Sequence, residues 1–570
     1  MQCILPRAWQ REGSVKAYVA IGLVVLVQFG TASAPARAES GSKPSGDPYA
    51  FDAETCAGMQ GRRFGDTRIV AATLARPPYT VRWMGSTRIA QANVPFCRLE
   101  AYASPVTRSH IGLEIWLPVR TFWNGRFLGV GAGGSMGDVN RVDMAAGINR
   151  GFAVVATDNG HRSPGPRDAN HWALGETERV VDFGHRAQHV ATIAGKAAVR
   201  AFYGRTPDFA YFFGCSQGGQ KGMMAAQRYP EDYDGIVAGA PVYSWTNLMT
   251  QQAWSVRALT ETPQSALSVA QMQALQDAAL QRCAAPNGVI VDPRQCAFDP
   301  AELACPRADV DTCLLPEQVV SASKMYAGPS TSDGRRLHAG FARGGERAWE
   351  QLYGDVSADG AVGGGSWLGV YRYMALDDPT FTLPQLDFDR HPALAKSKLG
   401  PHLDPDDPDL DDFAKRGGKL IVFHGWSDQQ TPAGASLDYR DAVLARSRAG
   451  DVDRYYRLFM VPGMPHCLPE MSSPTSTPPA LGPNLYLFAD NAAGVPFTPR
   501  NDALTALQYW VERDVAPESF DVRIRHDAAG LAPRTVLSCA EPRVPGYLGS
   551  GDPLDPAHWR CEMRTGEAAR

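Results

Sequence analysis

Residues 214–218 read Gly-Cys-Ser-Gln-Gly, a G-x-S-x-G pattern that places one serine between closely spaced glycines. The pattern follows a short β-rich run at residues 210–213 and precedes residues 220–228, which are typical of a helix. A sharp strand-to-helix turn of this kind has no room for large side chains, and it exposes the serine hydroxyl. The pattern therefore predicts that Ser216 is a nucleophile.

A serine hydroxyl attacks efficiently only when a base accepts its proton, so a histidine and a carboxylate should accompany Ser216. After a G-x-S-x-G turn the usual chain order is serine, then acid, then histidine. His466 lies in a loop after a late β-rich run and is the predicted base, and Asp428 ends an earlier run and is the predicted acid. Asp438 is the alternative acid, although it falls in a predicted helix over residues 434–446 and is more typical of a surface charge. We interpret His424 as a core or supporting residue.

Acyl transfer also requires hydrogen-bond donors for the oxygen that becomes negative in the transition state. The amide of Gln217, directly after the predicted nucleophile, is one candidate. A glycine-rich turn at residues 131–135 can supply the second, with Gly134 as first choice and Gly133 as the alternative. Such turns also bind phosphate, but the chain has no G-x-x-x-x-G-K-[ST] pattern, which argues against that function.

The chain has 11 cysteines, and Cys3 lies near the start, in a stretch that we expect to be removed. The remaining ten suggest a disulfide framework, because an even number of cysteines is typical of exported proteins. No C-x-x-C spacing occurs, so a zinc site is not favoured. Proximity in sequence suggests four pairs: Cys56 with Cys97, Cys283 with Cys296, Cys305 with Cys313, and Cys539 with Cys561.

Two cysteines remain, and each adjoins a predicted catalytic residue. Cys215 precedes Ser216 and Cys467 follows His466. A disulfide between them would join two distant loops and hold the nucleophile near the base. The alternative is a buried free thiol beside Ser216.

The first 38 residues are typical of a secretory signal peptide. Basic residues Arg7, Arg11 and Lys16 precede an uncharged apolar stretch at residues 17–34, and residues 36–38 read Ala-Arg-Ala, an A-x-A cleavage site. An uncleaved membrane anchor is the alternative, because the apolar stretch approaches spanning length. The sequence therefore predicts a periplasmic or secreted protein with no stable membrane association after cleavage.

Short β-rich runs that end in glycine or polar turns alternate with helical patterns, which favours a mostly parallel α/β sheet. The clearest helix is predicted over residues 187–203. The alternation of strand and helix patterns is lost between residues 244 and 399. We interpret this stretch as an inserted lid domain between two parts of a catalytic domain, 39–243 and 400–570. The predicted strands cover residues 127–130, 152–156, 210–213, 236–238, 420–423 and 456–460.

Composition narrows the class of protein further. The 570 residues are 44% hydrophobic and 20% charged, with a formal net charge of −4, which is typical of a globular protein. The chain lacks the basic stripe that a nucleic-acid partner would require. The expected partner is a small molecule.

Taken together, the motifs resemble the tannase and feruloyl esterase family, which includes the mono(2-hydroxyethyl) terephthalate hydrolases. The resemblance implies an α/β-hydrolase core with a lid, a Ser216–Asp428–His466 triad, a Cys215–Cys467 disulfide, and hydrolysis of esters of aromatic acids. Feruloyl or other hydroxycinnamoyl esters are the first choice of substrate, galloyl esters the second and terephthalate monoesters the third. A non-catalytic binding protein on the same scaffold is the remaining alternative. The motifs are Trp123-Asn-Gly-Arg-Phe127, Gly214-Cys-Ser-Gln-Gly-Gly219, Tyr233-Asp-Gly-Ile-Val-Ala-Gly-Ala-Pro241, His424-Gly-Trp-Ser-Asp428 and Pro462-Gly-Met-Pro-His-Cys467.

The chain departs from the family at one segment. Relatives often carry a calcium loop in the lid, roughly C-D-x-x-D-G-x-x-D-G, in which several carboxylates hold the ion. In the corresponding segment, residues 283–296, Ala284 takes the first acidic place and Asn287 the last, and only Asp292 remains as a carboxylate. We therefore predict that the calcium site is lost or very weak and that no other cofactor is needed.

Substrate choice is expected to depend on the lid. Trp367 and the Tyr371-Arg372-Tyr373-Met374 segment could line an aromatic pocket, with Arg372 near a carboxylate, or could form the core of the lid. The sequence leaves both interpretations open. Four arginines are interpreted as solvated loop charges: Arg335, Arg336, Arg343 and Arg347.

Overall fold

The computed structural model describes most of the chain after the predicted signal peptide. Residues 1–38, with Cys3, lie outside the described residues, and Tyr49–Arg570 folds as one unit. Within the described residues, no helix combines the length and apolarity needed to cross a bilayer. The described ranges are 47–82, 89–163, 170–305, 312–355, 366–448, 451–467, 480–481, 496–525 and 534–564.

The strands that the sequence predicts lie together in one ten-stranded sheet, with the order β1-β2-β5-β6-β8-β7-β9-β10-β11-β12. Strands β8, β7, β9, β10, β11 and β12 are parallel, and antiparallel strands extend the other edge. All six predicted strands are confirmed. The strands are β1 Arg63–Phe64, β2 Thr67–Ala75, β5 Phe96–Ala103, β6 Ile111–Pro118, β7 Arg126–Val130, β8 Ala153–Thr157, β9 Phe209–Cys215, β10 Gly235–Gly239, β11 Lys419–Gly425 and β12 Tyr456–Val461.

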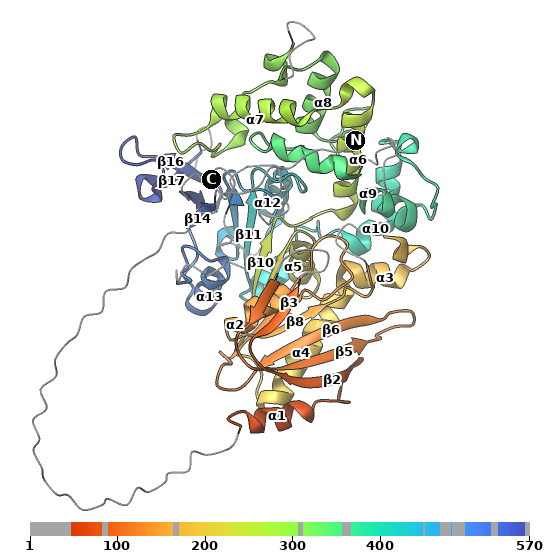
Figure 1. The fold of residues 1–570 in the computed structure, drawn as a ribbon, viewed down its shortest axis with the longest axis vertical. Helices are drawn as coiled ribbons and strands as arrows, with labels where there is room; N and C mark the ends of the chain where they lie inside the picture. Colours follow the sequence, from red (N-terminus) through yellow and green to blue (C-terminus); the bar gives the residue numbers. More distant parts are fainter. Residues whose placement is uncertain are drawn as a thin grey trace, which may run out of the picture. The chain divides into compact units, whose positions relative to one another are not determined.

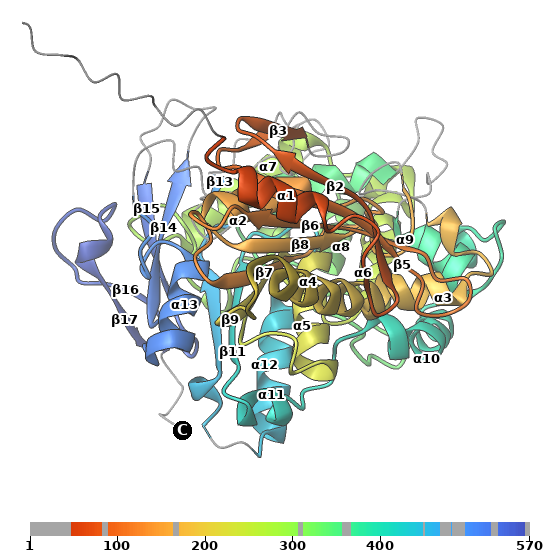
Figure 2. The same cartoon turned by 90° about the horizontal axis from the view of Figure 1, so that it is seen from below.

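Alternate residues of the parallel strands enter two apolar layers, one on each face of the sheet. In β11, for example, Leu420 and Val422 belong to one layer, and Ile421 and Phe423 belong to the other. Figure 2 shows α4 and α5 together on one side of the sheet. The helices of the first layer are α4 Ala187–Tyr203, α5 Gln217–Arg228, α11 Asp411–Lys415 and α12 Gly434–Arg446, and those of the second are α2 Arg141–Asn149 and α13 Ala503–Arg513.

A long segment, residues 240–418, connects β10 to β11 and is called here the inserted segment. Figure 1 shows its helices α6, α7 and α8 at the top of the picture, above β10 and β11. It contains one apolar cluster of its own and shares a second with Ala173, Val180 and Phe183, which explains why the sheet pattern is lost between residues 244 and 399. Besides α11, which packs in the first layer on the sheet, its helices are α6 Trp245–Thr260, α7 Val269–Cys283, α8 Pro316–Ala327, α9 Ser366–Gly369 and α10 His391–Leu403.

The beginning and end of the inserted segment are joined through the buried carboxylate of Asp404. One oxygen accepts a hydrogen bond from the Thr246 amide at 3.1 Å, and the other accepts from the Ser244 and Thr246 hydroxyls at 3.0 and 2.7 Å. Lys396 Nζ lies 2.7 Å from the same carboxylate. Because one charged group satisfies donors from both ends, the two crossings between sheet and inserted segment are fixed to each other.

Smaller elements complete the unit. The remaining helices are α1 Ala50–Ala57 and α3 Thr177–Val181, and a π-helical turn, Asp182–Arg186, leads from α3 into α4. The remaining strands are β3 Tyr79–Arg82 with β4 Ile89–Ala92, β13 Ala480–Leu481 with β14 Ser519–Arg525 and β15 Arg534–Cys539, and β16 Arg543–Tyr547 with β17 Trp559–Met563.

Five disulfides cross-link the described residues. Four of them join the cysteines that proximity in sequence suggests, and the fifth joins Cys215 to Cys467 across 252 positions. This number of disulfides indicates that the chain folds in an oxidising compartment, because thiols stay reduced in the cytosol.

Candidate active site

The three predicted catalytic residues follow three strands of the parallel part of the sheet. Ser216 comes directly after β9, Asp428 lies three residues beyond β11, and His466 lies in the loop after β12. Carboxyl ends of parallel strands meet at one edge of a sheet, which is where such folds bind ligands. The topology therefore brings together residues that are up to 250 positions apart in sequence.

Ser216 occupies a strained turn. Its φ of 61° and ψ of −123° lie in a region that side-chain-bearing residues rarely adopt. The Ser216 amide donates to Gly239 O at 2.9 Å, which fixes this conformation against β10. Helix α5 begins at Gln217, three residues earlier than the sequence predicts, because the turn is completed by Ser216 alone.

Small residues let the turn approach the loop after β7. A Cβ atom added to Gly131 would lie 2.6 Å from the Cα atom of Gly218, so only glycines permit this contact between two backbones. The Gln217 amide and the turn at residues 131–135 thus come from segments in direct contact. This is the arrangement that two oxyanion donors from different strands require.

The Asp428 carboxylate is buried and surrounded by donors. Its Oδ2 lies 2.7 Å from His466 Nδ1 and 3.2 Å from His424 Nε2, and its Oδ1 accepts from the amides of Gln430 and Thr431 at 2.9 and 2.7 Å. Burial alone would raise the pKa of Asp428, but His466 and His424 hold it well below its usual value. The carboxylate is therefore ionised and can orient the His466 ring.

His424 supports this carboxylate. Its Nε2 lies 2.8 Å from Thr431 O and its Nδ1 lies 2.8 Å from Ser436 Oγ, so both ring nitrogens have partners inside the protein. The side chain is fully buried. These contacts agree with the interpretation of His424 as a supporting residue.

The Cys215–Cys467 disulfide connects the turn that carries Ser216 to the loop that carries His466. The Cα atoms of the two cysteines are 6.0 Å apart. Cys467 Sγ also lies 3.6 Å from His466 Nε2, the ring nitrogen that does not face Asp428. Because Ser216 and His466 are the immediate neighbours of the two half-cystines, the bond limits how far they can separate.

Sequence reasoning missed a glutamine that holds the histidine loop. The His466 amide donates to Gln429 Oε1 at 3.1 Å, and Gln429 Nε2 donates to Gln351 Oε1 at 3.0 Å. Gln351 belongs to a 3₁₀ segment, Glu346–Asp355, of the inserted segment. The polar run after Asp428 was a signal for such a role, but the partner 78 residues away could not be read from it.

The turn at residues 131–137 is held by side chains that accept or donate at its backbone groups. Asn140 Nδ2 donates to Gly131 O at 2.8 Å, Asn159 Nδ2 donates to Met136 O at 2.9 Å, and the Gly137 amide donates to Ser163 Oγ at 2.8 Å. His161 Nε2 lies 3.1 Å from Ser135 O. The turn that contains Gly133 and Gly134 is therefore fixed from several elements.

The alternative acid and the four arginines occupy different environments. Asp438 is half exposed and pairs with exposed Arg336 at 2.8 Å, as expected for a surface charge. Arg335 is also exposed, whereas Arg343 is half-buried and its Nε donates to Phe298 O at 2.7 Å. For Arg347 the prediction is wrong. Its side chain is 5% exposed and pairs with Glu350 at 2.5 Å, because this part of the inserted segment is buried against the rest of it.

The two interpretations of the aromatic residues in the lid are separated by burial. Trp367 and Tyr371 are fully buried in one apolar cluster of the inserted segment, and the Tyr371 hydroxyl lies 2.8 Å from Thr250 Oγ1. Arg372 Nε donates to Phe381 O at 2.6 Å. These contacts favour a role in the apolar core of the inserted segment over a role in a substrate pocket.

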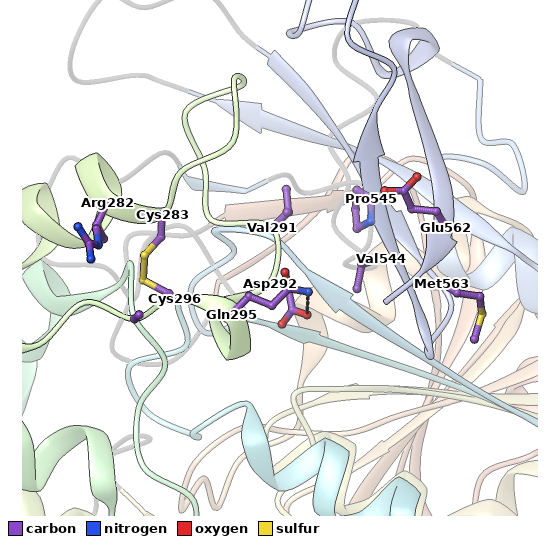
Figure 3. Close-up of a pocket in the computed structure, with 11 residues that line it drawn as sticks. Arg282, Cys283, Val291, Asp292, Gln295, Cys296, Val544, Pro545, Glu562 and Met563 are labelled. Atoms are coloured by element: carbon purple, nitrogen blue, oxygen red, sulfur yellow. Dashed lines mark hydrogen bonds between the residues drawn. A yellow bond between two sulfur atoms is a disulfide. The ribbon is translucent and has the colours of Figure 1, made fainter. Parts of the chain in front are cut away.

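A pocket of about 410 Å³ lies between the loop closed by the Cys283–Cys296 disulfide and the β16–β17 hairpin. Figure 3 shows Asp292 and Gln295 on one side and Val544, Pro545, Glu562 and Met563 on the other. Ser216, Asp428 and His466 are not among its lining residues. The pocket is thus separate from the candidate catalytic residues.

The one carboxylate of residues 283–296, that of Asp292, already has a cationic partner. Asp292 Oδ1 lies 2.6 Å from Arg294 Nε, and the same guanidinium lies 2.9 Å from Glu541 and over the ring of Trp426. Among the described residues, no three acidic, histidine or cysteine side chains converge as a metal site. Arginine thus neutralises the acid that a calcium ion would have to recruit.

We predict that the purified protein carries no stoichiometric calcium. Calcium takes six to eight oxygen ligands, and a carboxylate bound by Arg294 is a poor contribution to such a shell. Metal analysis should find well below one calcium per chain, and EDTA should leave the melting temperature and the esterase rate unchanged. One tightly held calcium per chain, with loss of stability on chelation, would contradict the prediction.

The fold and the site together define the class of protein. A serine at a strained strand-to-helix turn and a buried Asp–His pair, all after strands of a mostly parallel sheet, are the features of α/β-hydrolases that act on esters. Residues 97–561 match the family model described as "Tannase and feruloyl esterase". The chain belongs to this family and is a carboxylic ester hydrolase.

Three known proteins show how far the similarity extends. The chain is 33% identical to a probable feruloyl esterase B-2 of Aspergillus flavus, covering 79% of this chain and 81% of the relative. It is 32% identical to a mono(2-hydroxyethyl) terephthalate hydrolase of Piscinibacter sakaiensis, covering 77% and 79%. The crystal structure of feruloyl esterase B from Aspergillus oryzae superposes with a TM-score of 0.78 at 26% identity, covering 90% of this chain and 100% of that one.

Proposed function

We propose that the protein is an exported serine esterase that cleaves esters of aromatic acids, of the feruloyl or hydroxycinnamoyl type, through an acyl-enzyme on Ser216. The observation that carries the proposal is the connection of Ser216 to the buried Asp428–His466 pair through the Cys215–Cys467 disulfide. Removal of residues 1–38 and delivery to the periplasm or the outside agree with the five disulfides.

In this mechanism His466 accepts the Ser216 proton as the hydroxyl oxygen attacks the ester carbonyl carbon. The amides of Gln217 and Gly134 donate to the resulting oxyanion, and Asp428 stabilises the imidazolium. The bond between the carbonyl carbon and the alcohol oxygen then breaks, and His466 gives its proton to that oxygen as the alcohol leaves. A water molecule, deprotonated by His466, releases the acid and restores Ser216.

The part of the inserted segment between about residues 244 and 399 is proposed to act as the lid that selects the acyl group. Its contacts to the catalytic loops support this role, since Ser427 Oγ donates to Gly344 O at 3.0 Å and Gln429 donates to Gln351. The names of the relatives support an aromatic acid as substrate, and they include both feruloyl esterases and a terephthalate monoester hydrolase.

A panel of three esters tests the choice of substrate. We expect the highest kcat/KM with methyl ferulate, a lower value with methyl gallate, and the lowest with a terephthalate monoester. Differences of about tenfold or more are expected, because unpaired polar groups in a buried site are costly. A preference for the gallate or the terephthalate ester would overturn the assignment of the substrate while leaving the serine mechanism in place.

A further inference from the structure

Lys221 is a buried lysine beside the candidate catalytic serine. It lies in α5, four residues after Gln217, and it is 1% exposed. Its Nζ donates to Gly184 O in the π turn at 3.1 Å and lies 4.7 Å from the centre of the Phe183 ring. Among the ion pairs of the described residues, none involves Lys221.

A lysine in such a place is costly. Burial holds the pKa of Lys221 well below its usual value, because the ammonium form would lose its hydration without gaining a carboxylate. An apolar side chain of similar shape would fill the space at a lower free energy. The amine must therefore be explained by the hydrogen bonds that it makes.

The Gln217 side chain is the second partner of this amine. Its carboxamide satisfies both of its neighbours in one orientation only, in which the nitrogen donates to Ala132 O at 2.7 Å and the oxygen accepts from Lys221 Nζ at 2.5 Å. In the reverse orientation the carboxamide oxygen would face Ala132 O and the nitrogen would face Lys221 Nζ, and only a long hydrogen bond of 3.5 Å from that nitrogen to Phe183 O would remain. The Lys221 amine therefore donates to two acceptors, Gly184 O and Gln217 Oε1.

These hydrogen bonds join the two segments that supply the proposed oxyanion donors. The backbone amide of Gln217 is one donor, and Gly134 follows Ala132 in the turn that supplies the other. Gly131 and Gly218 bring the same two backbones into contact. The Gln217 side chain therefore links both donors, and Lys221 determines which way that side chain is turned.

We propose that Lys221 is a positioning residue for the oxyanion hole, acting through the Gln217 carboxamide on the turn at Ala132. The inference rests on the proposed serine esterase mechanism. It gives a reason for a buried amine whose other contacts are with Gly184 and Phe183 of the π turn. The chain of contacts runs from Gly184 O through Lys221 and Gln217 to Ala132 O.

The test is the variant Lys221→Met, which keeps an unbranched apolar side chain that reaches about as far as the lysine Cε and removes the N–H donors. Oxyanion stabilisation operates in the transition state, so we expect kcat to fall between about 10-fold and 100-fold while KM changes less than about twofold. A boronic acid, which forms a tetrahedral anionic adduct on the serine, should bind more weakly by a similar factor. If Lys221 had only a structural role, the variant would have a changed melting temperature, but the losses of kcat and of boronic-acid affinity would not match.

Lys196→Met is the matched control. Lys196 is a partly buried lysine of α4 whose Nζ donates to Glu231 O at 3.3 Å, away from the candidate site. This variant should retain the parent kcat. If Lys196→Met lowers kcat as much as Lys221→Met does, the proposal fails.

Gln217→Ala provides a second route if Lys221→Met folds poorly. It keeps the backbone donor and removes the carboxamide, so it should reproduce the loss of kcat, and the double variant should be no slower than the slower single variant. If the fold losses of kcat in the two single variants multiplied in the double variant, or if Gln217→Ala left kcat unchanged, Lys221 would not act through the Gln217 carboxamide. A fully active Ser216→Ala protein would instead overturn the proposed function itself.

Discussion

Replacing Ser216 by alanine should lower kcat for a nitrophenyl ester by about a million-fold, because the variant cannot form an acyl-enzyme. The hydroxyl lies at a strained turn that is maintained by the hydrogen bond from the Ser216 backbone N–H to Gly239 O. Because this bond does not involve the side chain, alanine should leave the backbone intact. Stopped-flow absorbance should show a burst of nitrophenolate equal to the enzyme concentration in the parent protein and none in the variant.

The matched control for this experiment is Ser323→Ala. Ser323 is exposed on α8, and its hydroxyl donates only to Val319 O of its own helix among the contacts described. This variant should retain the parent burst and rate. An active Ser216→Ala protein would refute the proposed mechanism, and a parent protein without any esterase activity would favour a binding protein on a hydrolase scaffold.

Replacing Asp428 by asparagine should lower kcat by about 10⁴-fold with little change in the fold. The amide would occupy the same space but could donate to His466 Nδ1, which would stabilise the wrong tautomer of the ring. Because His466 and His424 hold the pKa of Asp428 well below its usual value, the carboxylate stays ionised throughout the pH range of esterase assays. The acidic limb of the parent pH profile should therefore report another group.

Asp438→Asn is the control for the acid. It removes an equal charge from an exposed pair with Arg336 and should change kcat less than twofold. If Asp438→Asn were the inactive variant and Asp428→Asn the active one, the assignment of the acid would be reversed. Circular dichroism and the melting temperature of both variants separate loss of catalysis from loss of structure.

The sheet and the serine turn could be predicted because their signals are local. Short apolar runs that end in glycine mark the strands, and the two glycines around Ser216 reflect a turn made of adjacent residues. The order of acid and histidine along the chain then limited the candidates, and strands β11 and β12 deliver Asp428 and His466 to the same edge.

The supporting contacts could not be predicted because each depends on packing between distant segments. Gln429 meets Gln351 only where the inserted segment reaches the loop after β11. Lys221 lies in an amphipathic helix where a lysine normally suggests a solvated face, and the π turn from another part of the chain covers it. The burial of Arg347 could not be predicted for the same reason, because its glycine-rich neighbourhood in sequence does not show which segment folds over it.

The Cys215–Cys467 disulfide spans the whole of the inserted segment, since the segment begins after Cys215 and ends before Cys467. A protease that cuts once within residues 240–418 would therefore yield two polypeptides that remain a single covalent molecule. Ser216 would belong to one polypeptide, and Asp428 and His466 to the other. The proteolysed protein would thus be a two-chain enzyme whose candidate catalytic residues are joined by a disulfide, and after reduction only non-covalent contacts such as the pairing of β10 with β11 would hold the two polypeptides together.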